Sequence, residues 1–228
     1  MGSVIVTLLP LIIASAVMPA PIIIMIMLLK SPQQGVLKAS AYLAGMTTLR
    51  LLQGLIFGLI LTGSTAATVD DSSGKSAVVS TLLMLLGVLL LIAAYKKWIK
   101  EEDPDAPPSK WLVMMDSLTP LKAFGVGFGL LSIGAKFWVF TLSAIAVIEE
   151  AQIGQPSSTV AYLLFVLLAE SFLLLLILIR MTLPDRSKSL LDSTSVWLAR
   201  YNRPIVVGFS LLFGLIFLVQ GISGLLQQ

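Results

Sequence analysis

The stretches AYLAGMTTLR at residues 41–50 and AYLLFVLLAE at residues 161–170 match each other and decide how the whole chain is interpreted. Each begins with Ala-Tyr-Leu and ends with a charged residue, Arg50 in the first and Glu170 in the second. The residues between are almost all apolar or small. A charge inside such a segment is energetically expensive, so it indicates a functional site by default. We therefore expect Arg50 and Glu170 to occupy matching places in two related segments.

The composition indicates an integral membrane protein. Hydrophobic residues make up 57% of the chain and charged residues 12%, and the mean hydropathy is +0.98. This leaves too little polar surface for a soluble globule. Helices satisfy their own backbone hydrogen bonds inside a bilayer, and each needs about twenty apolar residues. The predicted fold is therefore an all-α membrane protein with six transmembrane helices, at Val4 to Leu29, Ala39 to Thr62, Ala77 to Tyr95, Leu121 to Ile148, Thr159 to Met181 and Pro204 to Leu226.

The chain contains no cysteine and no histidine. Thiol nucleophiles, imidazole bases and the commonest metal ligands are therefore missing. We expect no enzymatic activity, no cofactor and no metal site. The net charge of +3 comes from basic residues beside the spans, which the sorting of positive charge to the cytoplasmic side explains without a nucleic-acid partner.

Lysine and arginine are distributed unevenly between the predicted loops. Twelve of them lie in the loops after spans one, three and five, whereas Lys75 is alone on the other side. Basic residues accumulate on the cytoplasmic side of membrane proteins. We expect a multi-pass protein of the cytoplasmic (inner) membrane with both termini on the extracytoplasmic side.

Six spans divide into two sets of three with opposite orientation, because an odd number of crossings inverts the second set. This is the inverted-repeat arrangement of many transporters. Residues 1–98 are the predicted first three-helix repeat, 99–118 a cytoplasmic linker with an interfacial segment, and 119–228 the second three-helix repeat. Gly87 and Gly214, each flanked by leucines, are a further match between spans three and six.

Two stretches are predicted to lie at the cytoplasmic membrane surface. The first covers residues 110–115 and is headed by Trp111, a residue typical of membrane interfaces. The second covers residues 190–201, where apolar residues recur at helical spacing. Both are interpreted as surface anchors, with a gate as the alternative.

Met18-Pro19-Ala20-Pro21 lies near the middle of the first span. Two prolines spaced in this way should break the helix, and a second half-helix would begin near Pro21. Its free N–H groups and partial positive charge would form an anion site at mid-membrane. On this interpretation Pro19, Ala20 and Pro21 contribute to substrate binding, and the alternative is a kink without a ligand.

Lys136 is a third charge expected deep in the membrane, near the middle of the fourth span. Across the pseudo-twofold axis Glu170 can pair with Arg50, but it can also pair with Lys136. Either pairing leaves one cation for an anionic substrate, so Arg50 and Lys136 are the predicted substrate-binding cations. Glu170, paired with Arg50, is the candidate coupling residue because it could exchange a proton. The alternative is an ion-pair strut that only closes the bundle.

Several short motifs resemble those of a known group of exporters: Met18-Pro19-Ala20-Pro21, Leu28-Leu29-Lys30-Ser31-Pro32, Ala41-Tyr42-Leu43-Ala44-Gly45 and Gly134-Ala135-Lys136. On these the chain resembles the LysE superfamily of small six-span exporters and, within it, the GAP family of sulfolipid- and peptidoglycolipid-addressing proteins. LysE-type proteins typically carry Pro-Gly-Pro and Asn-Pro-Lys where this chain has Pro19-Ala20-Pro21 and Gly134-Ala135-Lys136. The resemblance implies two inverted three-helix repeats with the site between them, and movement of amphiphilic, often glycolipid-like molecules.

Together these features predict a flippase-like secondary transporter that exports an anionic amphiphile, such as a lipid or glycolipid, by alternating access. A LysE-type amino-acid or ion exporter and a non-transporting scaffold of a lipid-export machine are the alternatives. A lipidic substrate predicts a cavity that opens sideways to the bilayer, whereas an amino acid predicts a closed polar pocket. The expected partner is a membrane lipid or a small anionic substrate, and a homodimer or contacts with lipid-synthesis or export proteins are compatible with this prediction.

Overall fold

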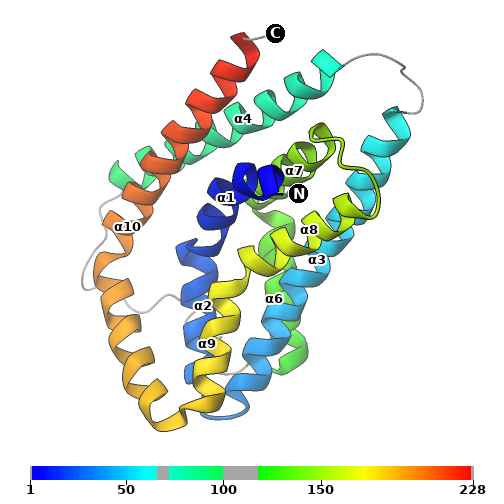
Figure 1. The fold of residues 1–228 in the computed structure, drawn as a ribbon. Coiled ribbons are helices and arrows are strands. Elements are labelled where there is room, and N and C mark those ends of the chain that lie inside the picture. The colour runs from blue at the N-terminus through cyan, green and yellow to red at the C-terminus, as the bar shows by residue number, and fades with distance from the viewer. Residues whose placement is uncertain (1, 66–71, 100–117, 227–228) are drawn as a thin grey trace.

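The fold is built from helices throughout the part of the chain that the structure describes. The computed structural model describes residues 2–65, 72–99 and 118–226, and every regular element there is an α-helix (Figure 1). The predicted all-α class is confirmed. In chain order the helices are α1 (Gly2–Ala16), α2 (Pro19–Lys30), α3 (Gly35–Thr65), α4 (Ser72–Ile99), α6 (Pro120–Ile133), α7 (Ala135–Glu150), α8 (Ser157–Ala169), α9 (Ser171–Thr182) and α10 (Pro184–Leu226).

Three of the six predicted spans consist of two helices joined at a bend. The bends measure 51° between α1 and α2, 71° between α6 and α7, and 54° between α8 and α9. The first was predicted from its prolines, and α2 begins at Pro19 rather than near Pro21. The bends at Gly134 and at Glu170 were not predicted, because neither position carries a proline.

Two helices are long and apolar enough to cross a membrane alone, at Ser80–Ile99 and Arg203–Leu226, and up to five spans result if each bent pair counts as one. The length and composition of these helices are therefore compatible with a multi-pass membrane protein. The described part of α3 is not among these candidates, and it carries Lys38, Arg50 and Gln53. The six-span inverted repeat stays a prediction.

The predicted linker at 99–118 and its interfacial segment at 110–115 lie almost wholly outside the described residues. The second predicted interfacial segment, residues 190–201, is part of α10, which continues through Pro204 to Leu226. The candidate span within α10 is Arg203–Leu226, which begins one residue before the predicted last span, so the helix continues across the predicted boundary without a break. The proline lies within the helix without ending it.

The helices α4 and α10 pack closely through small residues. A Cβ atom placed on Gly87 would lie 2.8 Å from the carbonyl oxygen of Gly214, and one placed on Gly214 would lie 3.2 Å from that of Gly87. Small residues let helices approach closely in membranes. The two glycines that matched in the sequence therefore face each other.

Connections gather at two ends of the bundle. The α2–α3 connection, the start of α6 and the α9–α10 junction lie at the lower end of Figure 1, and the α7–α8 connection lies at the upper end. The lower end carries Lys30, Lys38 and Lys122, and the upper end carries Glu149 and Glu150. These five residues group as the charge count predicted, whereas the sorting of the other charges and the membrane side of each end stay predictions.

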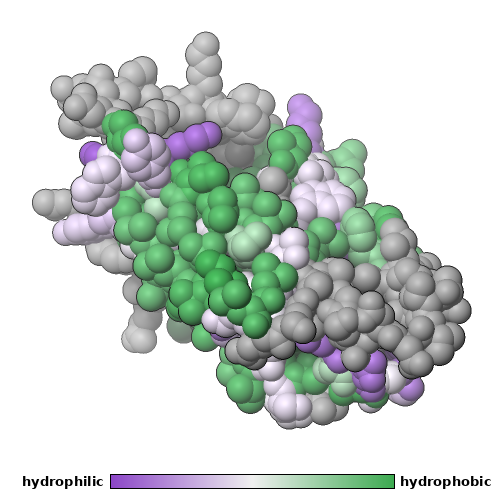
Figure 2. Space-filling model, turned by 90° about the horizontal axis from the view of Figure 1, so that it is seen from above, coloured by the Kyte–Doolittle hydropathy of each residue, from purple (hydrophilic) through white to green (hydrophobic). Residues whose placement is uncertain are grey.

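Apolar side chains cover much of the described surface, as the predominance of hydrophobic residues in Figure 2 illustrates. Exposed examples come from several helices and include Val6, Leu55, Leu121, Val219 and Leu226. Large exposed apolar areas are unusual on soluble monomers and typical of surfaces that contact lipid. The helices are therefore suited to a bilayer.

Candidate functional site

Arg50 and Glu170 lie together in the interior of the protein. Nε of Arg50 is 3.2 Å from Oε1 of Glu170, and only 2% and 4% of the two side chains are exposed. Arg50 comes from the middle of α3, and Glu170 is the residue between α8 and α9. The structure thus brings together two residues that the sequence placed 120 positions apart.

Hydroxyl groups bind both members of this ion pair. Nη2 of Arg50 donates a hydrogen bond of 2.7 Å to Oγ of Ser15 in α1. Oγ1 of Thr47 lies 2.5 Å from Oε2 of Glu170 and 3.0 Å from the carbonyl oxygen of Leu43. A hydroxyl group has one proton and can also accept. Thr47 can therefore donate to a carboxylate at Glu170, or accept from a protonated carboxyl while it donates to Leu43.

Two aromatic residues of α8 complete the surroundings of Arg50. The hydroxyl of Tyr162 donates a hydrogen bond of 2.5 Å to the backbone carbonyl of Arg50. The guanidinium carbon of Arg50 lies 5.8 Å from the centre of the Phe165 ring, which is within reach of a cation–π interaction. We call Ser15, Thr47, Arg50, Tyr162, Phe165 and Glu170 the Arg50 cluster.

Broken helices surround the cluster with partial charges of suitable sign. Ser15 lies in the last turn of α1, and the C-terminal end of a helix carries a partial negative charge that favours a cation such as Arg50. Glu170 immediately precedes α9, whose N-terminal end carries a partial positive charge that favours a carboxylate. Arg50 is therefore near a helix end of opposite sign, whereas Glu170 lies at the end of α8 as well as at the start of α9.

Some buried polar atoms in and around the cluster lack a hydrogen-bond partner among the described residues. They include Nη1 of Arg50, both amide atoms of Gln53, and the hydroxyls of Tyr42 and Ser143. Nε of Arg50 and Oε1 of Glu170 are close enough for an ion pair but are not aligned as a hydrogen bond. Buried polar groups are normally paired, so each exception requires an explanation such as a bound water or ligand. Arg50 thus retains donor capacity at one nitrogen.

The break in the first span lines a cavity of about 280 Å³. Pro19 and Ala20 contribute to its wall together with Met18, and α10 contributes Phe209 and Ser210. Because proline has no N–H, Ala20 is the only residue of the sequence 19–21 that can donate from its backbone. The predicted anion site at this helix start therefore has fewer donors than an ordinary helix N-terminus. Pro21 is buried in α2.

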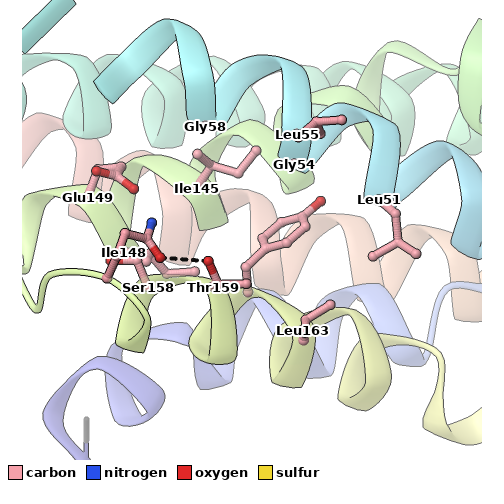
Figure 3. A pocket seen from close by; sticks show the side chains of 12 residues that line it. Leu51, Gly54, Leu55, Gly58, Ile145, Ile148, Glu149, Ser158, Thr159 and Leu163 are labelled. Atoms are coloured by element: carbon pink, nitrogen blue, oxygen red, sulfur yellow. Dashed lines mark hydrogen bonds between the residues drawn. The ribbon is translucent and has the colours of Figure 1, made fainter. Parts of the chain in front are cut away.

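Tyr162 also lines a groove of about 290 Å³ between α3, α7 and α8 (Figure 3). Its floor includes Ile145 and Ile148 of α7, which are 4% and 2% exposed. Its edges include Leu51 and Leu55 of α3 and Leu163 of α8, which are 41%, 61% and 49% exposed. The groove therefore opens at the apolar surface of the bundle.

Lys136 lies in the first turn of α7, two residues after the bend at Gly134. Its side chain lies outside the described part of the structure, so the structure assigns it no contact. The described partners of Glu170 are Arg50 and Thr47.

Comparison with family models matches residues 8–223 to Sap, sulfolipid-1-addressing protein. The match covers nearly the whole chain. The chain belongs to this family. The comparisons found no match among curated proteins and none among solved structures.

For this member of the sulfolipid-1-addressing protein family, the predicted resemblance to the GAP family is confirmed. Membership of the LysE superfamily stays a prediction. The matched range includes the whole Arg50 cluster, from Ser15 to Glu170.

Sequence reasoning missed four members of the cluster: Ser15, Thr47, Tyr162 and Phe165. Thr47 could have been found from its position one helical turn before Arg50 on α3, because residues three apart share a helix face. Tyr162 belongs to the Ala-Tyr-Leu triplet that marked the repeat, eight residues before Glu170. Ser15 had no signal beyond a hydroxyl in an apolar run, and Phe165 had none.

Proposed function

We propose that this protein is a flippase-like secondary transporter that exports an anionic amphiphile, such as a lipid or glycolipid, across the cytoplasmic membrane. The observation that carries the proposal is that buried Arg50 is bound by Tyr162, which lines a laterally open apolar groove, and by Ser15, which is close in sequence to the wall of a second cavity. Tyr162 lines the groove and binds the backbone of Arg50. Ser15 binds the guanidinium and lies three residues before Met18, which lines the second cavity.

The groove favours an amphiphile over an amino acid. Its exposed edges are leucines, whereas a site for a free amino acid would enclose polar groups around both charged ends. An apolar chain can stay in contact with the bilayer at these edges while a polar head approaches the cluster. The family name refers to a sulfolipid, which is a substrate of this amphiphilic kind.

The charges of the Arg50 cluster suit the binding of an anionic lipid head and a change in the Arg50–Glu170 pairing during transport. Two nitrogens of Arg50, Nε and Nη1, have no hydrogen-bond partner among the described residues, and Nη1 is also outside the ion pair, so Arg50 can bind an anion without losing Ser15. The Thr47 hydroxyl is placed to bind Glu170 in either protonation state. In alternating access, a change in the Arg50–Glu170 pairing would connect the cluster to one cavity and then to the other. Lys136 is the second proposed cation of this path.

Reconstitution of the purified full-length chain in liposomes tests the proposal. Fluorescent phosphatidylglycerol is placed in the inner leaflet, and its appearance outside is followed by a membrane-impermeant quencher, with uptake of a labelled amino acid measured in parallel. We expect the protein to accelerate lipid movement at least about tenfold, a barrier reduction of about 1.4 kcal/mol. If only the amino acid moves, the LysE-type alternative is correct, and if neither moves, the scaffold hypothesis replaces transport.

Two variants and one control connect the transport to the cluster. The double change Arg50→Met with Glu170→Gln removes both charges together and should reduce lipid movement to the rate of protein-free vesicles. Lys136→Met should also abolish transport while expression stays intact. Lys122→Gln removes an exposed cation at the start of α6 and should leave transport unchanged. Wild-type transport in the double variant would contradict the assigned role of the cluster.

A further inference from the structure

The groove between α3, α7 and α8 is lined by apolar residues over most of its length and by polar residues at one end. Leu51, Leu55 and Leu163 form exposed apolar edges, and the buried isoleucines of α7 form the floor. Glu149, Gln155 and Thr159 line it near the α7–α8 connection. Thr159 donates a hydrogen bond of 2.6 Å to the side-chain oxygen of Gln155 (Figure 3).

This order of polarity is that of a lipid in a bilayer leaflet. The α7–α8 connection lies at one end of the bundle, where a lipid head would meet water (Figure 1). The apolar part of the groove runs from there along α3 and α8 to Leu51 and Leu163. Among the described residues no lysine or arginine lines the groove, so these residues do not attract an anionic head more strongly than any other polar head.

Tyr162 forms part of the wall of the groove. Its ring occupies the space beside Gly54, where any Cβ atom would collide with it. Its hydroxyl binds the carbonyl oxygen of Arg50, and the Arg50 side chain behind it is 2% exposed. One aromatic ring therefore lines the groove and contacts the backbone of the residue that carries the buried cation.

We propose that this groove binds a single acyl chain of a membrane lipid, and that the Tyr162 ring is the barrier between the chain site and Arg50. The assignment rests on the proposed function, because it names the part of the substrate that the groove holds. A volume of about 290 Å³ lies just below the range of roughly 300–1,000 Å³ that encloses a drug-sized ligand. The groove thus holds one chain segment and leaves the head outside it or at the cluster.

The absence of cysteine makes a site-specific optical test direct. A Cβ atom placed on Gly58, which lines the groove, meets no atom within 4 Å. The same holds for Gly125, an exposed residue of α6 outside the groove. The variants Gly58→Cys and Gly125→Cys each receive a small fluorophore, and the labelled full-length chain is placed in nanodiscs of phosphatidylcholine with increasing fractions of the same lipid carrying a nitroxide on its acyl chain.

We expect the fluorophore at Gly58 to reach half-maximal quenching at an about threefold lower fraction of nitroxide lipid than the fluorophore at Gly125, a preference below 1 kcal/mol. Thr159→Phe, at the exposed edge, fills the groove and should bring the Gly58 value to that of the control. Overlapping curves at the two positions, or no effect of Thr159→Phe, would overturn the chain site. Binding is measured at equilibrium, so retained quenching without lipid movement in liposomes would refute the proposed function and leave the site standing.

The barrier is tested with Ser15→Cys, whose thiol replaces a hydroxyl that is 7% exposed and bound to Arg50. Tyr162→Ala should raise the rate of its reaction with a small cationic thiol reagent about tenfold, because local opening of about 1.4 kcal/mol is no longer required. Tyr162→Phe keeps the ring and should leave the rate within about twofold. Tyr95→Ala, at an exposed residue of α4, is the matched control. Equal rates in the Ala and Phe variants of Tyr162 would show that the ring is not the barrier.

Discussion

The segments at 41–50 and 161–170 match in sequence but differ in backbone. Arg50 lies inside α3, which continues without interruption from Gly35 to Thr65. Glu170 lies at a 54° bend between α8 and α9. Two equivalent positions that carry opposite charges therefore present them in different ways, one from a continuous helix and one from a junction between two helices.

The difference shows how a buried ion pair can be stabilised from both sides. An arginine side chain is long and reaches the interior from a continuous helix. Glutamate is shorter, and it reaches the interior from the junction where α8 ends and α9 begins. Arg50 in turn faces the end of α1 through Ser15. The partial negative charge at the end of α1 thus complements the charge of Arg50 and offsets part of the desolvation penalty of burying it.

Removal of one charge gives the largest expected effect. Glu170→Gln leaves Arg50 buried without a counter-charge, and breaking such a pair costs about 3–5 kcal/mol. We expect a loss of this size in the free energy of unfolding, measured by denaturing-detergent titration of mixed micelles. The double variant Arg50→Met with Glu170→Gln should recover most of it, because no unpaired charge remains. A double variant as unstable as the single one would mean that the two groups do not interact.

Exchange of the charges tests whether the two positions are equivalent. Arg50→Glu with Glu170→Arg restores an ion pair but places a carboxylate beside the negative end of α1. Helix-end effects reach about 2 kcal/mol when partly buried, so the exchange should stay about 2 kcal/mol less stable than the wild type while exceeding both single variants. Full recovery in the same titration would show that the helix ends contribute nothing.

The sequence predicted one of the three bends and the identity of the ion-paired residues. Pro19 and Pro21 predict the first bend, since proline removes a backbone donor and collides with the preceding turn. The segment AYLLFVLLAE at residues 161–170 does not predict the bend at Glu170, because all its residues are compatible with a helix. That bend depends on contacts with α1, α3 and other elements distant in sequence. The choice between Arg50 and Lys136 as partner of Glu170 depended on packing in the same way.

The groove could not be predicted from the sequence for a similar reason. Its residues come from α3, α7 and α8, and which faces of three apolar helices meet cannot be inferred from hydropathy alone. A glycine in a membrane helix lets a neighbouring group approach closely. The specific partner of Gly54, the Tyr162 ring, follows only from the assembled bundle.

Two glycines of α3 provide a test of intermediate size. Gly54→Ala places a Cβ atom against the Tyr162 ring, and such overpacking typically costs about 1–3 kcal/mol. Gly58→Ala meets no atom within 4 Å and should be neutral or stabilising by up to about 1 kcal/mol through helix propensity. The detergent titration compares the two directly. Equal effects would mean that Tyr162 does not pack against α3.

The smallest expected effect distinguishes the two tyrosines that precede the charges by eight residues. The Tyr162 hydroxyl binds the carbonyl of Arg50, so Tyr162→Phe should lower the free energy of unfolding by about 0.6 kcal/mol, the average for interhelical hydrogen bonds in a membrane protein. The Tyr42 hydroxyl is buried and has no partner among the described residues. A buried hydroxyl without a partner is destabilising, so Tyr42→Phe should leave stability unchanged or raise it. If both changes destabilise equally, Tyr42 has a hydrogen-bond partner in the membrane, and the two segments are more alike around their tyrosines than around their charges.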